Sequence, residues 1–141
     1  MSGRFFLDTN ILIYTFDRTT PDKAGKADQL VRHAVQSGEG VISYQVVQEF
    51  FNFALRRLSP PMTATDAELY FTSVLRPLVA VHSSITLYFR ALGLSERYKL
   101  RWYDSLIVAG ALEAACDRLY TEDLQHGQVI EGLRIVNPFR N

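Results

Sequence analysis

The stretch RFFLDTNIL, residues 4–12, predicts a buried strand that ends in a carboxylate and turns directly into a helix. Residues 4–7 form a short apolar strand. Asp8, Thr9 and Asn10 follow as a turn, and all three are residue types that favour the start of a helix. A carboxylate beside an apolar run is costly to bury unless a positive charge compensates it. The stretch therefore indicates a fold of strands and helices and marks Asp8 as a candidate functional residue.

Short apolar runs alternate with helical patterns along the rest of the chain. One helix is expected over residues 47–58, stopped by Pro60 and Pro61, and another, rich in small residues, over 102–116. The other expected strands cover residues 40–43, 78–81, 118–121 and 130–136. Strands that alternate with helices favour a parallel sheet covered on both faces. We expect an α/β fold, a three-layer α/β/α sandwich around a mainly parallel, five-stranded sheet, in a single domain over residues 1–141.

Three further acids stand beside apolar runs: Glu49, Asp104 and Asp123. In parallel sheets, ligands bind beyond the carboxyl ends of the strands. Asp8 and Asp123 follow predicted strands, and Glu49 and Asp104 are expected in the first turns of helices that leave the same edge. Taken singly, each acid also fits an ordinary role, such as a helix cap or a solvated side chain. Their joint placement predicts one acidic site, for which a divalent cation is the least costly compensation.

The composition narrows the class of protein. Lys and Arg number 15 and so do Asp and Glu, so the formal charge is zero. This is a mild argument against a protein that binds nucleic acid by charge alone, but bound metal ions would supply part of the positive field. The longest apolar run, residues 106–112, is too short to span a bilayer. Cys116 is the only cysteine, which excludes an intrachain disulfide. We expect a cytoplasmic protein without a membrane partner.

Four blocks of sequence, in this order and at these separations, resemble the PIN-domain ribonucleases, and more narrowly the VapC toxins of type II toxin–antitoxin systems. The blocks are Phe6–Leu12, Ser43 with Glu49, Tyr103–Ala109 and Tyr120–Leu124. The resemblance covers essentially the whole chain. It implies a PIN-like three-layer fold beneath a cluster of acids that binds Mg²⁺ or Mn²⁺.

The resemblance also implies roles for individual residues. The implied metal ligands and catalytic residues are Asp8, Glu49, Asp104 and Asp123, and the implied polar supports that orient them are Asn10 and Thr121. The expected function is a metal-dependent endoribonuclease that hydrolyses RNA phosphodiester bonds, the toxin of a toxin–antitoxin pair. Carboxylate oxygens suit hard Mg²⁺, which activates water and polarises a phosphoryl oxygen. The number of ions stays open.

The implied partners are an RNA substrate, a cognate antitoxin protein and a second copy of the chain. The antitoxin is expected to enter an apolar groove on the helix that carries Phe51 and Phe53. For RNA, the segment before Asp104 interleaves three cations with three aromatic residues. Cations hold phosphates and aromatic rings stack on unpaired bases, so the expected RNA-binding residues are Arg97, Lys99 and Arg101. The alternative is that Trp102 and Tyr103 pack in the core.

Other functions fit the sequence less well. A haloacid-dehalogenase-like phosphotransferase requires a second Asp two residues after the first, and this chain has Asn10 there. A response-regulator receiver requires adjacent acids near the first strand and a Lys after the last, and neither pattern is present. The serious rival is a catalytically silent PIN-like scaffold that binds RNA. The three histidines, His33, His82 and His126, lack metal-ligand spacing and are interpreted as structural or surface residues.

Overall fold

The computed structural model describes residues 3–140, so Met1, Ser2 and Asn141 of the expected domain lie outside the described residues. The strands are β1 (Phe5–Leu7), β2 (Gly40–Ser43), β3 (Val79–Val81), β4 (Arg118–Tyr120), β5 (Val129–Ile130) and β6 (Leu133–Val136). The helices are α1 (Thr9–Tyr14), α2 (Pro21–Ser37), α3 (Tyr44–Ala54), α4 (Ala64–Tyr70), α5 (Arg76–Leu78), α6 (Ile85–Tyr98) and α7 (Trp102–Glu113). A π-helical turn, Phe71–Leu75, joins α4 to α5. Strands and helices alternate as the sequence predicts.

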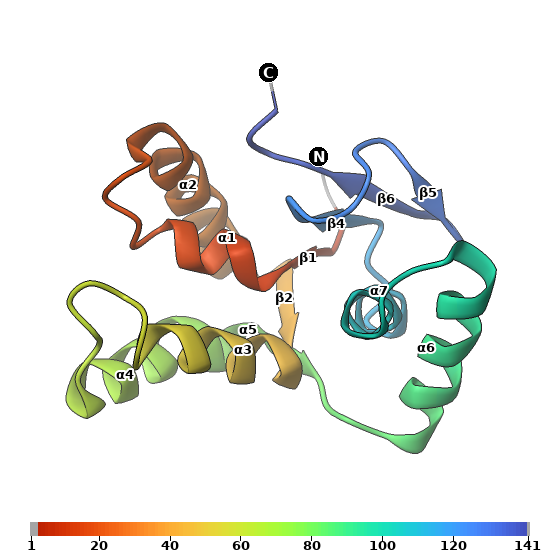
Figure 1. Cartoon of the computed structure of the whole chain (residues 1–141), viewed down its shortest axis with the longest axis horizontal. Coiled ribbons are helices and arrows are strands. Elements are labelled where there is room, and N and C mark those ends of the chain that lie inside the picture. Colours follow the sequence, from red (N-terminus) through yellow and green to blue (C-terminus); the bar gives the residue numbers. More distant parts are fainter. Residues whose placement is uncertain (1–2, 141) are drawn as a thin grey trace.

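Strand β1 lies inside the sheet and is buried on both faces. Successive side chains of a strand point to opposite faces. Accordingly, Phe5 stacks on His33 of α2, with ring centroids 5.5 Å apart, while the ring of Phe6 lies beside Gly110 of α7. Both phenylalanines are almost completely inaccessible to solvent. Figure 1 shows α1 and α2 on one side of the strands and α6 and α7 on the other. The predicted three-layer α/β/α arrangement is confirmed.

Within residues 3–140 the sheet has six strands, in the order β3-β2-β1-β4-β6-β5, and not the five that the sequence predicts. All neighbouring strands are parallel except β5 and β6, which pair antiparallel. The predicted strand over 130–136 is interrupted at Glu131 and Gly132, which both have positive φ angles, 50° and 88°. Two consecutive residues of this kind form the tight turn typical of a β-hairpin. The expected last strand is therefore a hairpin of β5 and β6.

Helices α2 and α7 approach the sheet closely because small residues line the contacts. A Cβ atom on Gly40 of β2 would lie 2.1 Å from the Cβ of Ala34 in α2, which no side chain tolerates. In α7 every residue from Ser105 to Ala111 is buried. The small residues that the sequence shows in this helix allow it to pack centrally.

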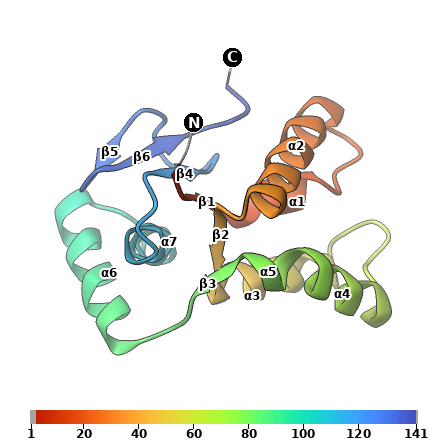
Figure 2. The ribbon, with the colours of Figure 1, turned by 180° about the vertical axis from the view of Figure 1, so that it is seen from behind.

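Helix α3 ends earlier than predicted, at Ala54 and not near Leu58. The backbone N–H groups of Arg56, Arg57 and Leu58 all point to the carbonyl oxygen of Phe53, so the helix closes in a tight turn before the prolines are reached. Thr63 caps α4, and its side chain accepts a hydrogen bond from the Asp66 N–H. Figure 2 shows the α4–α5 segment running into β3 at the edge of the sheet. Within residues 3–140, no helix is both long and apolar enough to cross a membrane.

Candidate active site

The four acids predicted from the sequence lie around the carboxyl edge of the parallel strands. Asp8 directly follows β1, and Asp123 lies three residues beyond the end of β4. Asp104 is the third residue of α7, in its first turn as expected. Glu49 is the sixth residue of α3 and so lies in its second turn, which corrects the prediction of a first-turn position. The helix begins at Tyr44, immediately after β2, and this moves Glu49 one turn further from the strand.

Asp8 is the most buried of the four, with 5% of its surface exposed. Its Oδ1 accepts a 2.7 Å hydrogen bond from the Thr9 N–H, which makes it the cap of α1. Its Oδ2 accepts a 2.7 Å hydrogen bond from the hydroxyl of Thr121. Asp8 therefore has the ordinary capping role and a place in the acidic cluster at the same time.

The neighbours of Asp8 perturb its ionisation. Burial raises the pKa of Asp8 to about 7, against an ordinary value of 3.8. The hydrogen bonds from Thr121 and Thr9 oppose this increase, and the negative charges of Asp123 and Glu49 add to it. Near neutral pH this carboxyl group is therefore only partly ionised when no cation is bound.

Asp104 is coupled to the same acids. Partial burial raises its pKa, the charges of Asp123 and Glu49 raise it further, and the nearby Arg101 guanidinium lowers it. The negative charges of Asp123 and Glu49 therefore act through space on both Asp8 and Asp104. Repulsion between carboxylates destabilises the folded protein unless a bound cation offsets it.

Hydrogen bonds from neutral side chains hold the other two carboxylates in place. Glu49 Oε1 accepts a 2.7 Å bond from the Thr9 hydroxyl, and its Oε2 accepts a 3.3 Å bond from Gln45. Asp123 Oδ2 accepts a 3.0 Å bond from the side-chain amide of Asn10. The contacts of Asn10 with Asp123 and of Thr121 with Asp8 are those expected of residues that orient acids.

Thr9 and Gln45 are two contributors that the sequence reasoning missed. Thr9 is 7% exposed and links α1 to Glu49, and Gln45 is 6% exposed and links Glu49 to the backbone carbonyl of Tyr103 at 3.2 Å. The available signal was their spacing. Thr9 follows Asp8 directly, and Gln45 stands four residues before Glu49, on the same face of a helix.

The acids are electrostatic neighbours, but their oxygen atoms do not meet at one point. Within residues 3–140, no three Asp, Glu, His or Cys side chains lie close enough together to hold one metal ion. The pKa shifts reflect charges that act over longer distances than a coordination bond. Each carboxylate of the trio Asp8, Glu49 and Asp123 instead accepts hydrogen bonds from protein groups.

The chemistry of the donor set fits a hard divalent cation. The four side chains offer only oxygen ligands, which suit Mg²⁺ and Mn²⁺. In addition, Asn10 Oδ1 is buried and accepts no hydrogen bond from any described residue. A buried acceptor without a donor is unusual, and here it belongs to a residue that contacts Asp123. The residues present therefore fit a metal of this class.

The predicted RNA-binding segment borders this edge. Arg97, Lys99 and Arg101 are all exposed. The alternative in which Trp102 and Tyr103 pack in the core is wrong, because they are 37% and 65% exposed. Tyr98 differs from these two aromatic residues, since it packs against the core. These three cations and two rings are thus accessible to a ligand beside Asp104.

Comparisons with known proteins give a family and a fold. The profile of the PIN domain family matches residues 5–131. No curated protein sequence matches the chain significantly. A solved toxin–antitoxin complex from Klebsiella pneumoniae contains a chain with a TM-score of 0.68 and 24% identity, covering 94% of this chain and 96% of that one.

Two further solved structures have the same fold. The sarcin–ricin loop cleaving toxin VapC20 of Mycobacterium tuberculosis has a TM-score of 0.62 and 19% identity, covering 84% of this chain and 89% of the toxin. VapBC2 from Rickettsia felis, solved with a promoter DNA fragment, has a TM-score of 0.60 and 15% identity, covering 93% of this chain and 96% of that one. At these identities the likeness shows the fold.

Proposed function

This chain belongs to the PIN domain family, and we propose that it is a metal-dependent endoribonuclease, the toxin of a type II toxin–antitoxin pair. In this proposal residues 1–141 form a single PIN-like domain, and the protein acts in the cytoplasm. Its fold resembles chains of toxin–antitoxin complexes and an RNA-cleaving toxin. The observation that carries the proposal is the burial of Asp8 within reach of the charges of Asp123 and Glu49.

The proposed ligands of Mg²⁺ or Mn²⁺ are Asp8, Asp104 and Asp123, with Glu49 completing the site directly or through water. A divalent ion of this kind, when bound, lowers the pKa of a water molecule and polarises a phosphoryl oxygen. The protein contributes the orientation of the oxygens. Thr121 fixes Asp8 through its hydroxyl, and Asn10 fixes Asp123 through its amide, so neither carboxylate has to be ordered when the site is loaded.

The proposed RNA-binding surface consists of Arg97, Lys99 and Arg101 with the rings of Trp102 and Tyr103. The cations would hold phosphates, and the exposed rings would stack on unpaired bases. Arg101 is close enough to Asp104 to influence its pKa. This surface would therefore deliver RNA to the acids even though the whole chain carries no net charge.

The proposed antitoxin binds an apolar groove between α3 and α4. A cavity of about 380 Å³ lies there, lined by Phe51, Leu55, Ala64, Ala67, Glu68 and Phe71. Its walls are almost entirely apolar, which suits the apolar face of an amphipathic segment. Phe53 does not line this cavity, so of the two phenylalanines expected in the groove only Phe51 supports this part of the proposal.

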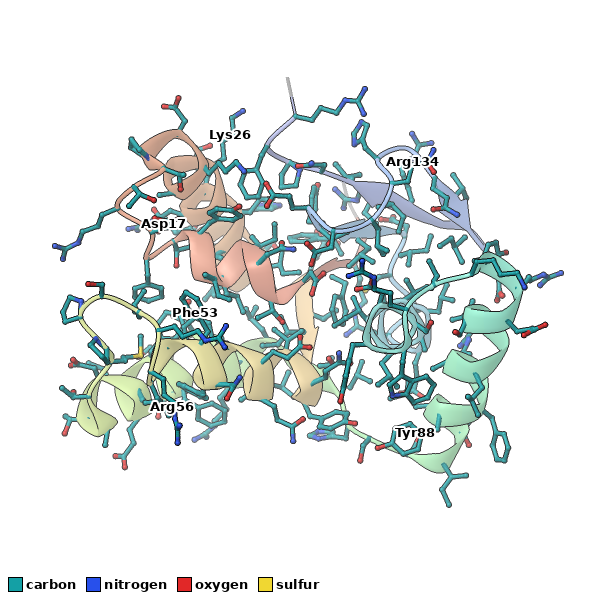
Figure 3. The ribbon with its side chains drawn as sticks, in the orientation of Figure 1. Asp17, Lys26, Phe53, Arg56, Tyr88 and Arg134 are labelled. Carbon is teal, nitrogen blue, oxygen red and sulfur yellow. The ribbon has the colours of Figure 1, made fainter. Side chains whose placement is uncertain are left out.

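The proposed homodimer forms through α6. Ile85, Tyr88, Phe89 and Leu92 are 74%, 41%, 71% and 55% exposed, at the i, i+3, i+4 and i+7 spacing of one helix face. Figure 3 shows Tyr88 near the lower end of α6, where the helix begins, and its ring lies 6.2 Å from that of Trp102. Contiguous apolar surface of this kind marks an interaction site, and a symmetric dimer brings the same patch of each copy together.

The test is cleavage of end-labelled transfer and ribosomal RNA by the purified protein in Mg²⁺, in Mn²⁺ and in EDTA. Asp8→Asn, purified identically, controls for contaminating nucleases. We expect discrete products that require metal and are absent with the variant. Binding of RNA without cleavage in any condition would favour the silent scaffold. Equal cleavage by Asp8→Asn would contradict the site assignment.

A further inference from the structure

Glu122, the residue before Asp123, is held by two helices at once. The Tyr14 hydroxyl of α1 donates a 2.5 Å hydrogen bond to Glu122 Oε1. Lys23 of α2 donates a 2.5 Å bond to the other oxygen, Oε2, and forms an ion pair with it. Lys23 Nζ also lies 3.2 Å from the Tyr14 hydroxyl oxygen. Both oxygens of this carboxylate are thus used, which leaves the side chain little rotational freedom.

Two aromatic rings complete the contacts around the cation. Lys23 Nζ lies 4.8 Å from the centre of the Tyr14 ring and 5.5 Å from that of Phe139. The two rings meet edge to face, with centroids 4.9 Å apart. A cation over aromatic faces is attracted by their quadrupoles. The group therefore ties together α1, α2, the loop after β4 and the chain after β6.

Helix α1 contacts two successive residues of the loop after β4. Asn10 and Tyr14 are four residues apart, so they lie on the same face of α1. Asn10 contacts Asp123, and Tyr14 contacts Glu122. Thr121, which precedes Glu122 in the loop, contacts Asp8. Three consecutive residues of the loop therefore each have a side-chain partner in the segment that begins at Asp8.

We propose that Tyr14, Lys23 and Glu122 are positioning residues that hold the loop after β4 so that Asp123 stays in the acidic site. None of the three belongs to the four acids to which a ligand role is assigned. The inference rests on the proposed function, because it gives these residues a role in assembling that site. The side chains of Lys23 and Glu122 are 37% and 27% exposed, so the attraction between their charges is weakened by solvent. The ion pair therefore contributes mainly by fixing the position of the loop.

The test compares Lys23→Met and Glu122→Gln with Arg32→Met. Arg32 pairs with Asp28 at 2.7 Å on the same helix, well exposed to solvent, so its loss removes an equivalent ion pair that does not touch the loop. Two quantities are measured on the full chain: the affinity for Mn²⁺ by titration calorimetry and the hydrogen-exchange rates of the amides of residues 121–127. Tyr14→Phe, which removes only a hydroxyl, replaces either variant that fails to fold.

We expect both cluster variants to bind Mn²⁺ about tenfold more weakly, as supporting groups of metal sites do, and to exchange the loop amides about tenfold faster. Arg32→Met should change neither. A purely electrostatic role predicts opposite signs, since Lys23→Met would strengthen cation binding and Glu122→Gln would weaken it. That result, or unchanged exchange in the loop, would overturn the inference.

If the wild-type protein binds no Mn²⁺, the proposed function fails, and exchange alone decides the inference. Faster exchange in residues 121–127 would still support the positioning role, and wild-type rates would contradict it.

Discussion

The Thr121 hydroxyl lies 2.7 Å from Asp8 Oδ2 and donates a hydrogen bond to it, which joins the end of β4 to the end of β1. The same hydroxyl oxygen accepts the N–H of Asp123 at 3.1 Å. Thr121 is completely buried. The Thr121 hydroxyl thus bonds to both Asp8 and Asp123, which are 115 residues apart in the sequence.

Thr121→Val should destabilise the protein by about 1–3 kcal/mol, because it leaves a buried carboxylate oxygen without its donor. Valine has nearly the same shape, so the loss of the hydroxyl is the main change. The measurement is urea denaturation at pH 8 in EDTA. Thr121→Ser keeps the hydroxyl and should lie close to wild type. Equal stability of the valine and wild-type proteins would show that the Asp8 hydrogen bond contributes nothing.

Asp8 should make the metal-free protein less stable as the pH increases. Its pKa is about 7 when folded and near 3.9 when unfolded. Between these values the folded state holds a proton that the unfolded state has released. Stability from this group is therefore fully present below pH 4 and is lost progressively as the pH rises to about 7.

Asp8→Asn should remove this loss, so its stability advantage over wild type should increase from pH 4 to pH 7 and then level off, reaching a few kcal/mol. The Thr121 hydroxyl can accept a bond from the new amide as readily as it donates to the carboxylate. The measurement is urea denaturation at intervals from pH 4 to pH 8 in EDTA. Parallel curves for the two proteins would contradict the raised pKa.

The sequence identifies the four acids because each stands beside an apolar run, and a charge in such a place is visible without a structure. Thr9 and Gln45 give no such signal. A threonine after an acid is typical of any helix start, and a glutamine in a helix is ordinarily a surface residue. Their roles depend on which helices meet across the sheet edge, and that is determined by tertiary packing.

The three-layer arrangement could be predicted because strand and helix periods differ along the chain. The β5–β6 hairpin was missed because the apolar residues Ile130, Leu133 and Ile135 stand close together in the sequence and were assigned to one strand. The only contrary signal was the pair Glu131 and Gly132. Positive φ is ordinary for glycine but uncommon for glutamate, so the pair does not stand out as a turn in the sequence.

Arg97 and Lys99 should contribute to RNA binding by charge. The double variant Arg97→Gln, Lys99→Gln should reduce the slope of log affinity against log salt by about 1.4 for single-stranded RNA, at about 0.7 per phosphate contact. Arg101 is left intact because it also affects Asp104. Binding is measured in EDTA in an Asp8→Asn background, which prevents cleavage.

The matched control for this experiment is Arg134→Gln. Arg134 is exposed on β6. In the parallel β4–β6 ladder its backbone is in register with Arg118, the first residue of β4, so it lies toward the amino ends of these strands and away from the acids at their carboxyl ends. Its loss should leave the salt slope unchanged. An identical slope for wild type and the double variant would remove Arg97 and Lys99 from the RNA-binding surface.

Phe89→Asp should convert a dimer into a folded monomer. Phe89 is 71% exposed in the described chain, so an aspartate there costs the protomer little, whereas a charge opposed to its own copy across a symmetric interface is destabilising. Light scattering after size exclusion should give twice 16.1 kDa for wild type and 16.1 kDa for the variant. Leu69→Asp, at a 66% exposed site on α4, should remain dimeric. If Phe89→Asp stays dimeric and Leu69→Asp does not, the interface lies on α4 and the apolar face of α6 has another partner.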